Sequence, residues 1–150
     1  MNDQLVEVLL VEDNPDDVEL TLHAFRKHQL SNRIHVVRDG VEALEFLFGT
    51  KDKEPGGTVG APRLILLDVK LPRIGGLEVL RHIKADKRTR TIPVVVMTSS
   101  MEERDLIESY QLGVNSYIVK PVDFDQFSEA VRLIGFYWLL LNQSPVQVSP

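Results

Sequence analysis

Five short apolar runs, separated by segments with helical periodicity, are the feature that most restricts the fold of this chain. Each run has the length of a strand, and three are almost entirely Val, Ile and Leu, as expected of strands covered on both faces. Strands that alternate with helices form parallel sheets joined by crossover helices. The sequence therefore predicts an α/β fold with five strands and five helices. The predicted strands are residues 5–11, 33–37, 63–68, 92–97 and 116–119.

Residues that favour helix starts precede most of the segments with helical periodicity. Asn14 stands before Pro15, which places an N-cap residue ahead of a proline at the first helical position. Asp39 and Asp123 predict the starts of the second and fifth helices, and Ser100 fits a capping box for the fourth. These signals place four helices directly after the strands that they follow.

Composition indicates one small domain that does not work by coating nucleic acid. The 150 residues are 43% hydrophobic, which is enough for one core, and the formal net charge of −5 argues against binding to phosphate backbones. The chain has no cysteine, so disulfides, thiolate metal sites and cysteine nucleophiles are excluded. Neither a secretory signal nor an apolar stretch of membrane-spanning length is visible. We expect a cytoplasmic protein with one domain over residues 1–142, a mobile loop at 50–62 and a disordered tail at 143–150.

Polar side chains of different kinds follow four of the predicted strands. Glu12 and Asp13 come after the first strand, Asp68 ends the third, Thr98 follows the fourth and Lys120 follows the fifth. The carboxyl ends of parallel strands meet at one edge of a sheet, where ligands and chemistry collect. Three acids, a hydroxyl and a lysine at one edge predict a site for a metal ion and a phosphoryl group.

Each of these residues also has an ordinary structural interpretation. Glu12 and Asp13 could belong to a helix-cap region, Thr98 could make local bonds only, and Lys120 could be a surface lysine. The three carboxylates favour the functional interpretation because they repel one another unless a divalent cation lies between them. A site with few protein oxygen ligands, completed by water and phosphate oxygens, is typical of Mg²⁺.

Four motifs, each at a strand end, resemble those of the receiver domain of two-component response regulators, the CheY-like family. They are LLVEDN at 9–14, LILLDVKLPRIGGLEVL at 64–80, VVVMTSS at 94–100 and YIVKP at 117–121. The resemblance covers about residues 6–141. It implies a flavodoxin-like (βα)5 fold, a doubly wound parallel sheet with strand order 2-1-3-4-5.

The resemblance also implies a role for each strand-end residue. Asp68 would accept a phosphoryl group from a sensor histidine kinase, and Thr98 and Lys120 would contact that group. The implied Mg²⁺ ligands are Glu12, Asp13, Asp68 and the backbone carbonyl of Lys70. Glu12 stands where many relatives carry Asp, and the Lys70 and Ser100 side chains flank the route by which water would reach the phosphoryl group.

The end of the chain carries two further features, a tyrosine in the last strand and an apolar final helix. Tyr117 occupies the place of the switch aromatic of the family, which turns inward when Thr98 moves toward the phosphoryl group; a tyrosine that only packs its ring is the alternative. Residues 136–141 are all apolar and cover every side of a helix, so one face is expected to meet a partner; a deeper contact with the core is the alternative. The predicted interface residues are Phe136, Tyr137, Trp138 and Leu140.

Regulators associated with cyanobacterial phytochromes resemble this chain in the stretch 11–25, in the long loop before residue 63 and in the FYWLLL ending. This resemblance implies a kinase fused to a light sensor as the partner and a homodimer through the last strand and helix. Because nothing follows the final helix, we expect output through protein contacts, without direct binding to nucleic acid or membrane.

Three competing functions fit the sequence less well. A phosphatase with an aspartyl-phosphate intermediate needs a second acid two residues after the nucleophile, and Lys70 stands there, so we expect a signalling protein rather than an enzyme. A flavodoxin-like FMN carrier would not place Glu12 and Asp13 in its phosphate loop. A receiver that signals without phosphorylation would not need the full set of acids with Thr98 and Lys120.

Overall fold

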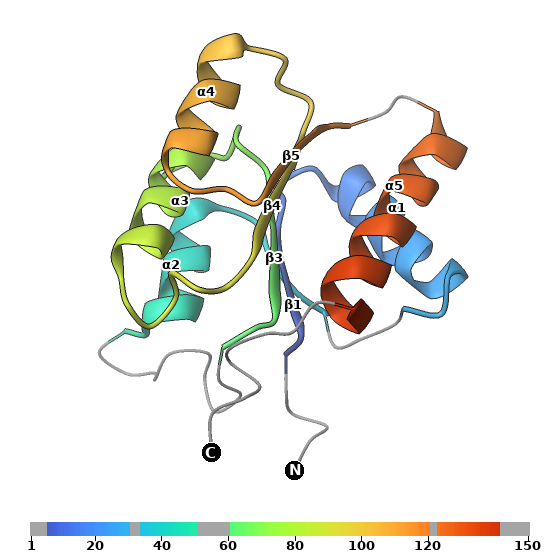
Figure 1. Cartoon of the computed structure of the whole chain (residues 1–150), viewed down its shortest axis with the longest axis horizontal. Coiled ribbons are helices and arrows are strands. Elements are labelled where there is room, and N and C mark those ends of the chain that lie inside the picture. Colours follow the sequence, from blue (N-terminus) through green and yellow to red (C-terminus); the bar gives the residue numbers. More distant parts are fainter. Residues whose placement is uncertain (1–5, 31–33, 51–60, 121–122, 142–150) are drawn as a thin grey trace.

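The computed structural model describes residues 6–30, 34–50, 61–120 and 123–141, which form a parallel sheet between two layers of helices (Figure 1). The strand order is β2-β1-β3-β4-β5, and every neighbouring pair is parallel. The predicted flavodoxin-like fold and strand order are therefore confirmed. The strands are β1 (Val8–Val11), β2 (Ile34–Val37), β3 (Leu64–Leu67), β4 (Val94–Thr98) and β5 (Ser116–Val119).

Within the described residues, five α-helices alternate with the strands and cover both faces of the sheet. Helices α1 and α5 lie together on one face, and α2, α3 and α4 lie on the other (Figure 1). This arrangement agrees with the predicted alternation of strands and crossover helices. The helices are α1 (Pro15–Lys27), α2 (Gly40–Phe48), α3 (Gly76–Ala85), α4 (Glu103–Gln111) and α5 (Phe124–Gly135).

The central strands are buried on both faces, so successive residues pack into different halves of the core. In β1, Val8 and Leu10 pack with α1 and α5, whereas Leu9 and Val11 pack with α2 and α3. This arrangement explains the near-continuous apolar composition of β1, β3 and β4, because neither face of these strands meets water. The edge strand β5 is only partly buried.

Most of the helix starts follow the capping residues in the sequence. The Oδ1 atom of Asn14 accepts hydrogen bonds from the backbone amides of α1, and Asp39 and Asp123 cap α2 and α5 in the same way. The predicted capping box at Ser100 is wrong. Helix α4 has Glu102 at its N-cap without a side-chain cap bond, and the Ser100 hydroxyl donates to Asp105 instead.

Helix α3 begins directly against the backbone of β3. A Cβ atom on Gly76 would lie 2.1 Å from the carbonyl oxygen of Asp68, a distance that no side chain can tolerate. The absence of a side chain at Gly76 therefore lets the start of α3 pack against the end of β3 and support it.

Helix α5 continues into a π-helical segment, η2 (Phe136–Leu141), that buries only part of its apolar surface. Leu139 is buried in the core and Trp138 packs against it, but Phe136 is 46% exposed and Tyr137 is 49% exposed. The side chain of Leu140, most of the predicted mobile loop and the predicted disordered tail lie outside the described residues. Among the helices that the structure describes, none is both long and apolar enough to span a membrane.

Candidate functional site

The sheet gathers the strand-end side chains through its backbone ladder. The amide of Glu12 donates to Val37, the amide of Asp68 donates to Val11, and the amide of Lys120 donates to Thr98. These bonds fix the residue that follows each strand at the carboxyl edge, where the topology brings β1, β3, β4 and β5 side by side.

Three carboxylates meet at this edge. One oxygen from each of Glu12, Asp13 and Asp68 lies within 4.8 Å of the others. Glu12 and Asp68 are buried, whereas Asp13 is exposed. Negative charges this close together in a partly buried place repel one another strongly, and a cation relieves that repulsion.

The Lys120 ammonium faces these acids. Its Nζ atom lies 2.5 Å from Glu12 Oε1, 2.7 Å from Asp17 Oδ2 and 3.2 Å from Asp68 Oδ2. The Lys120 side chain is 9% exposed, so these contacts are shielded from water. Lys120 therefore ties the end of β5 to β1, β3 and the first turn of α1.

The two oxygens of Asp68 have different partners. Asp68 Oδ1 accepts a hydrogen bond of 2.6 Å from the Thr98 hydroxyl and one of 3.0 Å from the backbone amide of Lys70. Asp68 Oδ2 faces the ammonium of Lys120. Asp68 is thus held from two sides while its carboxylate stays within reach of the other acids.

Burial and like charge change the proton affinity of this cluster. Burial raises the pKa of Glu12 from 4.5 to about 7, and the nearby Asp68 carboxylate adds to the rise, although the bond from Lys120 opposes it. Burial by itself lowers the pKa of Lys120, but the bonds to Asp17 and Glu12 outweigh that effect and raise it overall. At neutral pH Lys120 is charged, and Glu12 is poised between its two forms.

A second layer of contacts lies behind Asp68, toward α4. The Lys70 ammonium lies 2.9 Å from Glu102 Oε1 and 3.3 Å from Asp105 Oδ2, so it points to α4 and not to the carboxylate cluster. The Tyr117 hydroxyl donates to the backbone carbonyl of Ser100 at 3.1 Å. Tyr117 is therefore attached to the loop between β4 and α4.

The structure brings every predicted strand-end residue to one place and adds two acids that the sequence analysis did not select. They are Asp17 in the first turn of α1 and Asp105 in the first turn of α4. The position of Asp17 carried a signal, because a helix that starts just after β1 starts at the same edge as the cluster. Asp105 carried none, since its role depends on how α4 packs.

The donor set fits a hard divalent cation. Carboxylate oxygens from two strands supply ligands of the kind that Mg²⁺ prefers, and Asp13 is open to water that would complete the coordination. The Thr98 hydroxyl and the Lys120 ammonium supply donors to oxygens with negative charge. The site is thus suited to hold a metal ion and to bind a phosphoryl group on Asp68.

Fold and site together define a class of protein, and comparison with known sequences agrees. The chain belongs to the response regulator receiver domain family, whose profile matches residues 8–132. This result confirms the family predicted from the four motifs.

Three relatives show where in the family the chain lies. FilR2 of Methanothrix harundinacea is 43% identical over 138 residues, which cover 92% of this chain and 86% of FilR2. The phosphorylated cyanobacterial phytochrome response regulator RcpA is 37% identical with a TM-score of 0.84, covering 94% of this chain and 99% of RcpA. The bacteriophytochrome response regulator AtBRR is 52% identical with a TM-score of 0.71, and the match covers 93% of this chain and 99% of AtBRR. The predicted likeness to phytochrome-associated regulators is confirmed.

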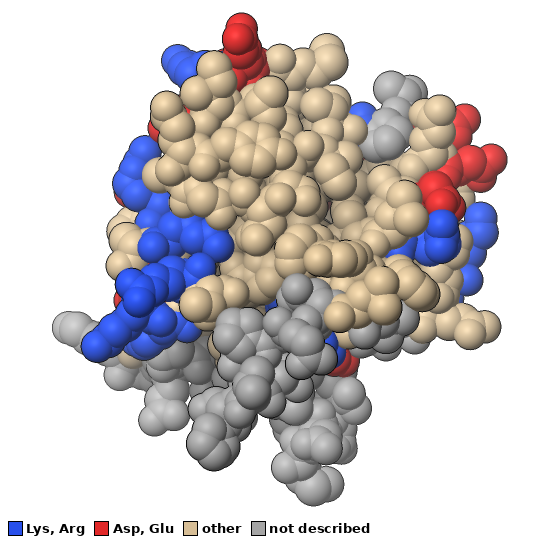
Figure 2. Space-filling view, in the orientation of Figure 1, with Lys and Arg blue, Asp and Glu red and all other residues tan. Residues whose placement is uncertain are grey.

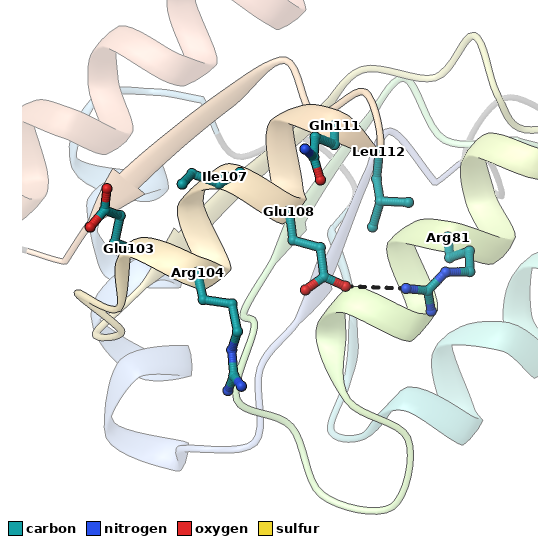
Figure 3. Close-up of a pocket in the computed structure, with 7 residues that line it drawn as sticks. All are labelled: Arg81, Glu103, Arg104, Ile107, Glu108, Gln111 and Leu112. Carbon is teal, nitrogen blue, oxygen red and sulfur yellow. Dashed lines mark hydrogen bonds and ion pairs between the residues drawn. The ribbon is translucent and has the colours of Figure 1, made fainter.

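Two other surface features lie away from the strand ends. A hollow of about 640 Å³ opens between α3 and α4, where Arg81 pairs with Glu108 beside Ile107 and Leu112 (Figure 3). Lys and Arg side chains also form a band over the α3 side of the molecule (Figure 2). The lining of the hollow includes none of the three acids of the carboxylate cluster.

Proposed function

We propose that this protein is a response regulator that accepts a phosphoryl group from a sensor histidine kinase on Asp68. The observation that carries the proposal is the position of Asp68, which lies among two further acids and contacts both Thr98 and Lys120. An oxygen of the Asp68 carboxylate forms the new bond to phosphorus as the bond between phosphorus and the kinase histidine breaks. The protein thus assists its own modification and its later hydrolysis.

The residues that would hold Mg²⁺ are Glu12, Asp13, Asp68 and the backbone carbonyl of Lys70. When bound, Mg²⁺ would neutralise charge on the transferring phosphoryl group. Lys120 already lies beside Asp68 and needs only a small movement to pair with a phosphoryl oxygen. Thr98 would turn its hydroxyl from Asp68 to the same group, since that hydroxyl has one proton to donate.

The signal would leave the site through Thr98 and Tyr117. The amide of Ser100 donates to the Thr98 hydroxyl, and the Tyr117 hydroxyl donates to the carbonyl of Ser100. A movement of Thr98 toward the phosphoryl group therefore disturbs the contact that holds Tyr117. The changed surface around β5 and α4 would be read by a partner protein.

The test is uptake of phosphate from acetyl phosphate in the presence of Mg²⁺. Wild type is expected to acquire a phosphate that is labile in both acid and base, as an acyl phosphate is, and Asp68→Asn is expected to acquire none. Asp86→Asn, which removes an acid in the loop after α3, serves as the matched control and is expected to behave as wild type. Base-labile phosphate on Asp68→Asn at the wild-type level would refute the assignment.

We further propose that the kinase is linked to a phytochrome. The names of RcpA and AtBRR connect those two relatives with phytochromes and bacteriophytochromes, which supports the proposal. FilR2 carries the name of a probable methanogenesis regulatory protein, so the test must also include histidine kinases that are not linked to a phytochrome. We expect the phytochrome kinase to transfer its phosphoryl group faster than the other histidine kinases of the host. We also expect the rate of this transfer to differ between red and far-red light. Equal transfer from all kinases would contradict it.

The exposed aromatic residues of η2 support a proposal of homodimerisation. Phe136 and Tyr137 are each about half exposed on a segment that follows the last helix. Sedimentation of wild type as a dimer and of Tyr137→Glu as a monomer is the expected result. Trp138→Glu tests the same face, but Trp138 also packs against the core, so Tyr137→Glu is the cleaner variant. A wild type that stays monomeric with and without a phosphoryl mimic would exclude the dimer.

A further inference from the structure

Asp105 is a buried acid that belongs to none of the roles described so far. It lies in the first turn of α4 and is 2% exposed. Its Oδ2 atom accepts a hydrogen bond of 2.6 Å from the Ser100 hydroxyl and lies 3.3 Å from the Lys70 ammonium. A buried carboxylate needs such partners, because an uncompensated charge in this position would be strongly unfavourable.

Both partners of Asp105 lead to the same oxygen of Asp68. The amide of Ser100 donates to the Thr98 hydroxyl at 3.2 Å, and that hydroxyl donates to Asp68 Oδ1. The amide of Lys70 donates to Asp68 Oδ1 directly. The two protein donors on this oxygen are therefore each attached to Asp105, one through Ser100 and the other through the side chain of Lys70.

The position of Asp105 between two donors makes this attachment firm. The Ser100 hydroxyl and the Lys70 ammonium both face its Oδ2 atom, and hydrogen bonds that involve charged groups are stronger than those between neutral groups. The Tyr117 hydroxyl adds a third connection, because it donates to the carbonyl of Ser100.

We propose that Asp105 is a positioning residue for the reaction at Asp68, a role that rests on the proposed function of Asp68 as phosphoacceptor. Asp105 holds Ser100 and Lys70 so that both donors stay on Asp68 Oδ1 in the unphosphorylated protein. Phosphorylation requires the Thr98 hydroxyl to turn away from this oxygen, and the segment around Ser100 must then shift. The bond from Ser100 to Asp105 opposes that shift, so Asp105 stabilises the resting state.

Thermodynamic linkage determines whether Asp105 weakens or strengthens the binding of a phosphoryl mimic. A contact made only in the resting state weakens the binding of any ligand that needs the other state. Removal of Asp105 should therefore strengthen the binding of a phosphoryl mimic. A residue that only supports the fold would have the opposite effect or none, because a damaged site binds its ligand less well.

The first experiment measures the affinity of the full chain for fluoroberyllate with Mg²⁺. Asp105→Ala is expected to bind it about fivefold more tightly than wild type or better, the lower range of typical coupling between sites. Ser100→Ala deletes the same bond from the other side and is expected to act in the same direction. The double variant should show no further gain, because the two residues share one bond. Unchanged or weaker binding by both single variants would overturn the proposal.

A matched control separates Asp105 from the general charge around Lys70. Glu102→Gln removes the other carboxylate that faces the Lys70 ammonium, but the Glu102 side chain is half exposed, and Glu102 contacts the Ser100 hydroxyl only through its backbone amide, which the substitution keeps. Its affinity for fluoroberyllate is expected to stay within about twofold of wild type. If Glu102→Gln tightens binding as much as Asp105→Ala, the effect belongs to the charge of Lys70 and the proposal fails.

The second experiment needs neither metal nor phosphoryl mimic. Hydrogen exchange of the Ser100 amide in the metal-free protein is expected to be faster in Asp105→Ala, while the amide of Val96 in the core of β4 stays protected. Equal exchange at Ser100, or an equal rise at both amides, would mean that Asp105 does not restrain this loop specifically. If instead wild type failed to bind fluoroberyllate, the phosphoacceptor role would fall, and the exchange result would still report on the restraint.

Discussion

Replacement of Glu12 by Gln should stabilise the metal-free protein, although it removes a residue of the site. Glu12 is buried beside Asp68, and these surroundings raise its pKa from 4.5 to about 7. Gln resembles the protonated form of Glu in size and hydrogen bonding. At pH 8 the variant therefore avoids a charge that the folded protein disfavours.

The magnitude follows from the change in proton affinity. Each pH unit between the folded and unfolded pKa corresponds to about 1.4 kcal/mol, so a rise from 4.5 to about 7 gives an upper limit of about 3 kcal/mol. The value is an upper limit because the protonation of Glu12 is coupled to the charges of Lys120 and Asp68. The sign depends on pH: the difference is near zero below pH 4.5, grows between pH 4.5 and 7, and is constant above pH 7.

Urea unfolding at pH 4.5, 6 and 8 with a chelator measures this difference. Glu103→Gln, at an exposed acid of α4, is the control and should match wild type at each pH. With Mg²⁺ the order should reverse, because wild type gains binding free energy that the variant partly loses. A Glu12→Gln protein no more stable than wild type at pH 8 without metal, or a difference that is independent of pH, would refute the reasoning.

Substitutions at three other positions test the packing, the helix caps and the site cation. Leu9→Ala in the fully buried β1 should lower the free energy of unfolding by about 2–5 kcal/mol, measured by denaturant unfolding; a loss under 1 kcal/mol would contradict the burial. Asp39→Ala should cost about 1 kcal/mol at pH 7, and Asp39→Asn less. The bond from the amide of Glu42 lowers the pKa of Asp39, so the penalty should shrink in acid. Lys120→Met should cost about 3–5 kcal/mol without metal, and Mg²⁺ should recover part of it; equal cost with Mg²⁺ would argue against a shared site.

The sequence predicted the sheet and its carboxyl edge because both depend on local pattern. Apolar runs between helix caps specify strands that are buried on both faces, and the residue after each strand must then lie at one edge. The first and last residues of the strands were predicted less accurately than the order of the elements. The fourth strand was predicted from residue 92, but β4 begins at Val94, since Pro93 has no amide to donate to the ladder.

The contacts between long side chains could not be predicted in the same way. Asp17 in α1 reaches Lys120 after β5, and this pair depends on the position of α1 across the sheet. The predicted cap at Ser100 failed for a related reason, because Asp105 competes for the hydroxyl and becomes available only when α4 is in place. Pattern thus identifies which residues reach the edge, whereas tertiary packing decides which partners they find there.

The contact between Gly76 and the backbone of Asp68 bears on the recombination of receiver domains. The start of α3 and the end of β3 touch backbone to backbone, with no side chain between them that could adjust. A crossover inside residues 69–75 would join β3 of one parent to the helix start of another and would require this contact to form anew. Chimeras that exchange residues 64–85 as one block keep Asp68 together with the helix that supports it. The position of Asp68 can then be inherited independently of the rest of the molecular surface.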